Sequence, residues 1–585
     1  MVSNQEVDRY TAITFAPVQG FIEKSRKLRD LYGSSYILSH LAEKICQAAL
    51  CHGGEVISPA LIAVAKGTPN QILIKGDFPE QEAKRIFHRA WGEIVDRCRS
   101  WIEKELPEYK YNWNREWKHW RNYTWEFFWV QGNSTKEVLA ELRELKRSRA
   151  WIGINWKGES STLSGADAIA YPTMDLFNPR KGNYHDEEEK IKGFYETLSK
   201  KEHAGNIIES REQLSIPELI KRLVTITEVA KEIGIQAIEQ VYPNYNDLNR
   251  LEKNEKTGWF VGDGDAFGKY LKSLAKDKTE DQADKSTNEF SMAMRNWAGG
   301  DYKTPILIIS LAIQNQLYRF ALLFLNFNHA GEFHKWVEGD EQGRVIYAGG
   351  DDFLGIFYRL PHNKINEEDV FALTAPECLE RLYKFPEVWR SHGHPVTVSV
   401  GFVWAYPSVP QRDVLQHCRE AEKTAKNQGR DRLAIRILFN SGNHLEWACP
   451  WNYLQKIFEG YCDRSGATGQ EANWTHLYND IAVLESRHAF NDQTTDITLA
   501  LWDIYFPDIT IPDTTIPDIS DRTKPLNLTD SQILWNKDGS DNLRISSGIL
   551  GEQPKIPDQK NPPSKKLNDW FINLAKVGFH LCFNT

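Results

Sequence analysis

The sequence predicts an α+β fold, and three observations lead to this prediction. A short apolar segment at 259–262 ends in acidic residues and glycines, two apolar runs at 344–348 and 353–357 flank a Gly-Gly-Asp-Asp turn, and helix-like and strand-like segments alternate from there to residue 439. Short apolar runs bounded by glycine and aspartate are typical of strands, whereas longer periodic segments are typical of helices.

The elements of this unit can be assigned in chain order. We expect a strand at 259–262, a helix at about 305–325, a hairpin at 344–357, a helix near 369–390, a strand at 395–402, a helix at 413–428 and a last strand at 433–439. The run at 304–325 contains Gln314, Asn315, Gln316 and Arg319, so we interpret it as a buried helix and not as a membrane span. The core order is βαββαβ, the ferredoxin-like arrangement on which palm domains are built.

The hairpin tip carries Gly349, Gly350, Asp351 and Asp352. Two adjacent carboxylates repel each other, and a divalent cation would offset that repulsion. The glycines leave room for a phosphate, and hard oxygen ligands suit Mg²⁺ or Mn²⁺. The alternative is a solvated turn, because Gly and Asp are ordinary turn residues.

A second acidic segment follows the strand at 259–262. Asp263 would bind a metal through its carboxylate and Gly264 through its carbonyl, and Asp265 is either a further ligand or a support for one. The backbone amides of Ala266, Phe267 and Gly268 could donate to phosphate oxygens. This strand and the hairpin would be adjacent in the sheet, so the sequence predicts that both acidic segments share ions.

The helix at 413–428 ends in Lys426, shortly before Gly429 and Arg430. A cation at this place stabilises the helix dipole, and a glycine suits a helix C-cap. The functional interpretation is that Lys426 contacts a triphosphate.

Together these motifs resemble the large subunit of type III CRISPR effector complexes, the Cas-ten or Cmr-two family. The similarity extends to the N-terminal segment Thr14–Ile22, to Arg26, Arg29–Leu31 and Ser35–Ser39, and to possible strands at 56–60 and 67–74. Because no acidic pair occurs there, the resemblance implies a degenerate first palm facing an active second one, with ATP between them. The helix ending at Lys426 also resembles that of GGDEF and class III nucleotide cyclases.

The resemblance implies an enzyme, a metal-dependent nucleotidyltransferase that makes cyclic oligoadenylates from ATP in antiviral defence. Asp263, Asp351 and Asp352 would be catalytic and would hold two Mg²⁺ or Mn²⁺ ions together with Gly264. The implied partners are other effector subunits, including a small helical subunit, with guide RNA and target RNA bound through the complex.

The sequence departs from this family in two ways. Family members often begin with an HD nuclease domain, but here the first palm-like strand starts near Thr11, so we expect no DNase activity; His185-Asp186 lies in a charged segment. The family often has a Cys-x-x-Cys-Gly zinc motif, which Ser161 and Ser164 replace. We therefore expect no zinc.

We expect four domains. These are a degenerate first palm at 1–150, a helical linker at 151–250, the catalytic GGDD palm at 251–440, and a helical C-terminal domain at 441–585 with a flexible insertion at about 507–566. Such a Pro-rich, polar insertion is typical of flexible sequence.

The composition fits a cytoplasmic assembly subunit with no membrane contact. The 585 residues include 8 cysteines without a Cys-x-x-Cys pair, and the first ten residues are not a signal peptide. The net charge of −9 gives no general attraction to nucleic acid, so RNA would need local patches. Candidates are the cations Lys24, Arg26, Lys27 and Arg29, and the Trp-rich segment 113–129, for which a place in the core is the favoured interpretation.

Two other functions stay open. A stand-alone dinucleotide cyclase of the GGDEF type would act without guide RNA, and the N-terminal motif argues against it. A catalytically silent scaffold would keep the motif without turnover, and the intact Asp263, Asp351, Asp352 and Lys426 argue against that alternative.

Overall fold

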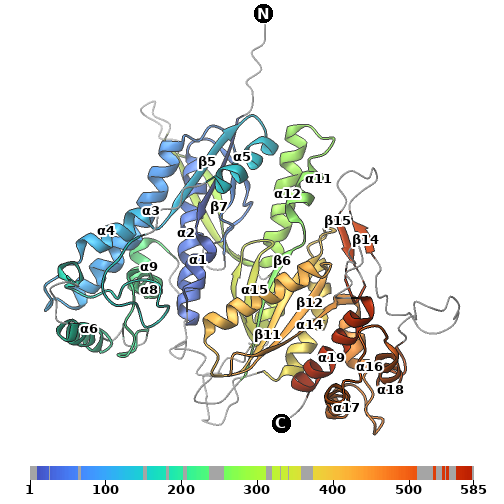
Figure 1. Ribbon diagram of the computed structural model, residues 1–585. Coiled ribbons are helices and arrows are strands. Elements are labelled where there is room, and N and C mark those ends of the chain that lie inside the picture. Colours follow the sequence, from blue (N-terminus) through green and yellow to red (C-terminus); the bar gives the residue numbers. More distant parts are fainter. Residues whose placement is uncertain are drawn as a thin grey trace, which may run out of the picture. The chain divides into compact units, whose positions relative to one another are not determined.

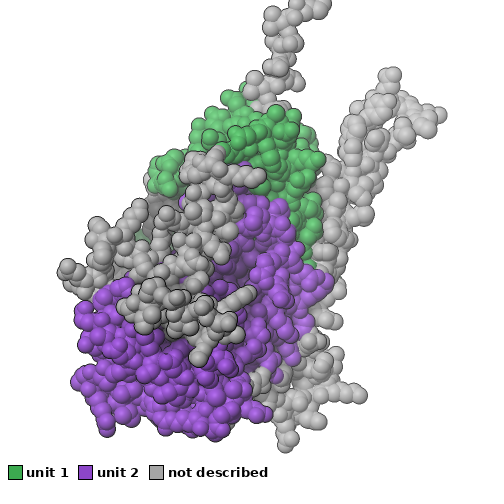
Figure 2. Space-filling model, turned by 90° about the vertical axis from the view of Figure 1, so that its right-hand side faces the viewer, with its two compact units in different colours: residues 1–249, 274–331, 346–350 green, residues 250–273, 332–345, 351–585 purple. Residues whose placement is uncertain are grey.

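A computed structural model describes most of the chain, and it divides the chain into two compact units. The described residues are 9–25, 27–63, 67–148, 154–178, 184–201, 204, 207–235, 256–310, 319–329, 331–339, 342–357, 373–509, 531–534, 543–546, 548–551 and 562–582. Unit 1 comprises residues 1–249, 274–331 and 346–350, and unit 2 comprises residues 250–273, 332–345 and 351–585 (Figure 2).

Unit 1 contains the first βαββαβ domain. Its elements are β1 (Tyr10–Ala16), α2 (Leu28–Cys51), β2 (Glu55–Ser58), β4 (Ile72–Lys75), α3 (Glu80–Glu105) and β5 (Glu126–Gly132), and a short α1 (Val18–Glu23) precedes α2 (Figure 1). The strand order is β2-β4-β1-β5 and all three pairs are antiparallel. This is the ferredoxin-like order, and β2 and β4 lie at the two strands expected after the N-terminal motif.

The central strand β1 buries both of its faces. Ile13 and Phe15 pack into the large core under α2 and α3, whereas Tyr10 and Ala12 pack into a smaller core that includes Val138 of α5 (Thr135–Arg147). Alternate residues of a strand face opposite sides, which explains the division. The Trp-rich segment, which includes α4 (Asn114–Tyr123), belongs to the larger core: Trp113, Trp117 and Trp125 are buried there, and Trp120 and Trp129 pack against it. The core interpretation of that segment is confirmed.

The linker region of unit 1 is helical where it is described. It includes α6 (Tyr184–Leu198), α8 (Ile216–Leu223) and α9 (Thr227–Ile233). Helix α8 crosses α2 closely at Gly33, where a Cβ would lie 1.8 Å from the carbonyl oxygen of Lys221. The crossing therefore requires glycine at this position.

Buried charges reinforce the α2–α8 crossing and occupy the predicted RNA patch. Arg222 is fully buried between Asp30 and Glu212, and Lys27 forms an ion pair with Glu212 at 2.9 Å. The other described cations of the patch are also engaged, since Arg29 donates to the Thr225 hydroxyl and Lys24 pairs with Asp167. These three cations support the fold, while Arg26 lies outside the described residues.

Ser161 and Ser164, the two serines that replace the cysteines of the family's zinc motif, take part in a hydrogen-bond network. The Ser161 hydroxyl and the Ser164 amide both donate to one oxygen of the buried Glu218 carboxylate, at 3.0 and 3.1 Å.

The second βαββαβ domain is centred on β6 (Thr257–Gly264). It continues with α13 (Glu332–Glu338), β9 (Gly343–Ala348), β10 (Phe353–Phe357), α14 (Ala375–Arg390), β11 (Val398–Ala405), α15 (Gln411–Asn427), β12 (Arg432–Leu438) and β13 (His444–Pro450). The strand order is β13-β12-β11-β6-β10-β9, and β6 is antiparallel to both β10 and β11. The βαββαβ prediction is confirmed, and β13 adds a strand beyond the last one predicted.

The predicted helix at 305–325 is wrong. The described part of this run forms β7 (Gly300–Ser310) and β8 (Arg319–His329), an antiparallel pair whose β7 also pairs with β3 (Ile62–Ala63). Its apolar residues follow one another without a helical period, so the pattern alone could not separate a helix from strands. The helices after β6 are instead α11 (Phe267–Leu274) and α12 (Glu280–Ala298), and α12 starts with a capping box of Thr279 and Gln282. No helix in the described part of the chain is long and apolar enough to cross a membrane.

The C-terminal region is mainly helical where it is described. It contains α16 (Trp451–Gly460), α17 (Thr475–Ser486), α18 (Asp496–Tyr505) and α19 (Pro563–Cys582). Helix α19 binds the sheet through the Trp570 indole, which donates to the Ala448 carbonyl of β13 at 2.8 Å. Most of the predicted insertion at 507–566 lies outside the described residues, and within it β14 (Ser531–Leu534) pairs with β15 (Leu543–Ser546).

Candidate metal and nucleotide site

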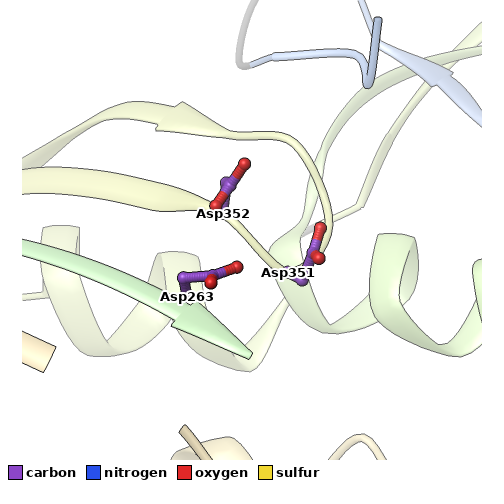
Figure 3. Close-up of side chains that lie close together, drawn as sticks. All are labelled: Asp263, Asp351 and Asp352. Atoms are coloured by element: carbon purple, nitrogen blue, oxygen red, sulfur yellow. The ribbon is translucent and has the colours of Figure 1, made fainter. Parts of the chain in front are cut away.

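Three carboxylates meet at one end of the second sheet. Asp263 lies near the end of β6, and Asp351 and Asp352 lie in the turn between β9 and β10 (Figure 3). Each offers a carboxylate oxygen, and these oxygens all lie within 4.8 Å of one another. The prediction that the two acidic segments share one place in the fold agrees with this geometry.

Strand pairing brings the acids together. In the β6–β10 register Phe353 is opposite Gly262, so Asp263 and the turn residues lie at the same end of the pair. A Cβ on Gly262 would lie 2.0 Å from the Phe353 ring, and the Gly264 amide donates to the Asp351 carbonyl at 3.2 Å. Gly350 has φ +138°, which favours glycine, and so the turn needs it.

The carboxylates of the turn are destabilised in their charged form. Burial and the nearby charge of Asp263 raise the pKa of Asp351 to about 7. Burial, Asp351 and Asp263 raise the pKa of Asp352 well above its ordinary value. Asp352 is exposed to solvent, so the neighbouring charges of Asp351 and Asp263 are the main cause of its raised pKa. Clustered carboxylates that resist ionisation are a donor set that fits a divalent cation.

Lys426, in the last turn of α15, faces this cluster. Its ammonium forms ion pairs with Asp263 and, at 2.5 Å, with Glu422. Burial lowers the pKa of Lys426, but the charges of Asp263 and Glu422 outweigh burial, so the pKa is raised and the side chain stays protonated. Here Lys426 partly neutralises the carboxylates, whereas the sequence suggested a contact to triphosphate.

Asp265 is not one of the three clustered acids. It is fully buried, and its carboxylate accepts hydrogen bonds from the Thr397 and Ser399 hydroxyls and from the amide of Asp431. The contacts hold β6 to the start of β11 and to the loop after α15. Burial raises the pKa of Asp265, and burial together with the Asp265 charge raises the pKa of Asp431 to about 7. Of the two expectations for Asp265, the structure favours a support over a ligand.

The segment expected to bind phosphate begins a helix. Ala266 has φ +53° and precedes α11, which starts at Phe267; Gly268 is exposed. Amides of the first helical turn have no acceptor within their own helix, so they could donate to an anion.

Sequence reasoning overlooked two acidic residues of this region. Glu422 precedes Lys426 by four residues, a spacing that signals an ion pair on one helix face. Asp431 had no such signal, because its proximity to Asp265 depends on strand pairing. The His185-Asp186 pair lies elsewhere, in the first turn of α6, where His185 is exposed and lies 3.6 Å from Glu189.

Comparisons with known proteins add independent findings. The family described as Cas10/Cmr2, second palm domain, matches residues 256–434, and the family described as CRISPR-associated protein Cmr2, N-terminal, matches residues 10–95. A search of curated proteins found no match.

Solved structures of effector subunits are also similar. A Csm1–Csm4 cassette in complex with cA4 is 13% identical over 78% of this chain, with a TM-score of 0.38, and this chain covers 58% of its length. Type III-B Cmr-beta in the apo state is 12% identical over 76% of this chain and 71% of its own, with a TM-score of 0.45. Cmr-beta bound to cognate target RNA is 10% identical over 99% of this chain and 83% of its own, with a TM-score of 0.48.

Proposed function

Because the chain belongs to the Cas10/Cmr2 family, we propose that it makes cyclic oligoadenylates from ATP as the large subunit of a type III CRISPR effector complex in the cytoplasm. One observation carries the proposal: Asp263, Asp351 and Asp352 place three carboxylate oxygens within 4.8 Å of one another on the matched palm domain. A catalytically silent scaffold would have no need for such a cluster, which costs free energy when no cation is bound.

The carboxylates and the Gly264 carbonyl would hold two Mg²⁺ or Mn²⁺ ions, which would activate a 3'-hydroxyl and stabilise charge on an α-phosphate. Because the pKa of Asp351 is raised to about 7, ion binding would release a proton from it near neutral pH, and a bound ion would offset the neighbouring charges that raise the pKa of Asp352. Asp265 supports the end of β6 from behind through Thr397 and Ser399.

In each transfer, the 3'-oxygen forms a bond to the α-phosphorus of an ATP. The bond from that phosphorus to the oxygen bridging the α- and β-phosphorus atoms breaks, and pyrophosphate leaves. The proton of the hydroxyl passes to solvent. Ring closure repeats the same step within one chain. Lys426 remains protonated beside Asp263, and its role would be to contact the triphosphate once cations neutralise that carboxylate. Phosphate oxygens would accept hydrogen bonds from the amides of Ala266, Phe267 and Gly268. The small Gly349 and Gly350 would leave room for them.

The proposal includes other effector subunits, among them a small helical one, and guide and target RNA bound through the assembly. Target RNA would raise the rate by favouring the competent arrangement of the site over the resting one. The chain alone would therefore be a poor cyclase.

The experiment compares initial rates for the isolated chain, the assembled complex, and the complex with complementary target RNA. Each labelled nucleoside triphosphate is supplied separately and the products are resolved by chromatography. We expect cyclic oligoadenylates from ATP, formed fastest with matched RNA. Equal rates in all three samples would favour the stand-alone cyclase, and no product in any of them would favour the scaffold.

A further inference from the structure

Helix α12 carries a stripe of polar residues on one face. The members recur at spacings of four, three and four, which places them on one side of a helix; they are Asp284, Asn288, Ser291 and Arg295. The whole stripe belongs to unit 1.

The first three members bind the first βαββαβ domain. Asp284 accepts hydrogen bonds from the Tyr10 hydroxyl at 2.6 Å and the Thr135 hydroxyl at 2.9 Å. Asn288 donates to the carbonyl of Ile57 at 3.0 Å, at the end of β2. Ser291 continues the series by accepting from the amide of Ala60 at 3.0 Å. Helix α12 is therefore fixed to β1, to α5, to the end of β2 and to the loop after it.

Arg295 ends the stripe and has two different carbonyl partners. Its Nε donates to the Leu61 carbonyl at 3.1 Å, and its Nη1 donates to the Ala348 carbonyl at 2.9 Å. The side chain is 1% exposed, so the guanidinium is desolvated and its hydrogen bonds are charge-assisted. Ala348 is the last residue of β9, and the next four residues are Gly349, Gly350, Asp351 and Asp352.

Within unit 1 this segment also lies against the loop at 67–69. A Cβ on Gly67 would lie 2.7 Å from the Tyr347 ring, and a Cβ on Gly350 would lie 3.9 Å from Pro69. The residues that lead into the acidic turn thus lie close to both Arg295 and the loop at 67–69.

We propose that Arg295 is a positioning residue that fixes the end of β9, and with it the start of the Gly-Gly-Asp-Asp turn, to α12 and to the loop after β2. The two glycines have no side chains with which to order the turn, so its order depends on the anchors at its ends. A metal site tolerates displacements of about 0.5 Å in its ligands, and the Ala348 carbonyl is anchored three residues before Asp351. The inference rests on the proposed function in one respect, namely that the turn binds divalent cations.

The test compares the full-length chain with Arg295→Met, Arg295→Lys and the control Asn288→Ala, which removes a contact of the same stripe to Ile57 alone. Hydrogen exchange measured by mass spectrometry reports the order of residues 344–354, and electron paramagnetic resonance titration reports Mn²⁺ affinity. In Arg295→Met we expect faster exchange in that peptide and about tenfold weaker Mn²⁺ binding. Arg295→Lys should restore part of both, and Asn288→Ala should resemble wild type.

Exchange and Mn²⁺ affinity in Arg295→Met equal to those of wild type would overturn the proposal, as would equal losses in Asn288→Ala. If Arg295→Met fails to fold, Arg295→Lys decides, because it keeps the charge but replaces the fork of donors by a single ammonium. A wild-type chain that binds no Mn²⁺ would refute the proposed function, whereas the exchange measurement would still decide whether Arg295 orders the turn.

Discussion

Replacing Asp351 by Asn should change stability in opposite directions with and without metal. The substitution keeps the shape of the side chain but removes one charge from a cluster of three carboxylates. Without metal the variant should be more stable than wild type near pH 8, because the remaining carboxylates repel less. With Mn²⁺ present the wild type should gain stability and the variant should gain little, because a ligand charge is missing.

The magnitude follows from the pKa of Asp351, which is raised from 3.8 to about 7. Three units at about 1.4 kcal/mol per unit give an upper bound of about 4 kcal/mol for the cost of ionising Asp351 in the folded chain. The residue is only half-buried, so solvent screening reduces this to about 2 kcal/mol. Saturating Mn²⁺ at about 100 times its dissociation constant would stabilise the wild type by about 2.7 kcal/mol.

The sign of the pH dependence provides a control. The folded pKa of Asp351 is raised, so the folded state binds more protons than the unfolded state between about pH 4 and pH 7. Wild-type stability relative to Asp351→Asn should therefore fall as pH rises through that window and stay low above it. At pH 4 the two proteins should be equally stable without metal.

The assay is thermal unfolding of both proteins at pH 4, 6 and 8, with EDTA or with Mn²⁺. Glu289→Gln is a matched control, because it also removes one carboxylate charge. Glu289 lies on the exposed side of α12, where its carboxylate forms a long, solvent-exposed ion pair with Lys285 at 3.9 Å. The reasoning is refuted if Asp351→Asn is less stable than wild type in EDTA at pH 8 and retains the full Mn²⁺ effect.

Three further perturbations test the function and the fold. Asp351→Ala combined with Asp352→Ala should abolish oligoadenylate formation and leave copurification of the other subunits unchanged; wild-type turnover would contradict the site. Gly33→Ala should destabilise unit 1 by about 3 kcal/mol in denaturant unfolding, because the added Cβ would lie 1.8 Å from a carbonyl oxygen. The control Gly193→Ala should not destabilise it, because a Cβ there would meet nothing within 4 Å. Burial lowers the pKa of Lys221 to about 8, so above that pH the unfolded chain binds more protons than the folded chain. The free energy of unfolding of the wild type should therefore rise between pH 8 and 10.5, by at most about 3 kcal/mol. Lys221→Leu should lack this rise.

Much of the second domain could be predicted from local sequence. The Gly-Gly-Asp-Asp turn, the flanking strands and the helix ending near Lys426 all carry short-range signals, because turn residues and apolar periods act within a few residues. The strands at 259–262 and 344–357 carried the expectation that Asp263 and the turn share one end of the sheet, although the first helix of the predicted order βαββαβ was misplaced at 305–325.

Other features depended on contacts between distant parts of the chain. The run at 305–325 is apolar at most positions, so its assignment to β7 and β8 was decided by which partner its backbone could pair with, including β3. The cations Lys24, Lys27 and Arg29 suggested an RNA patch, but acidic groups and a hydroxyl from distant parts of unit 1 engage them.

The sequence by itself determined which acids could form the site, because a pair of adjacent carboxylates on a glycine turn is a local pattern. Only the tertiary structure decided what each charge does. Lys426 lies beside Asp263, Asp265 faces Thr397 and Ser399, and Arg295 holds the Ala348 carbonyl. The physical reason is that each of these charges is partly or fully buried, and a buried charge must find its partner wherever the fold provides one, at any distance along the chain.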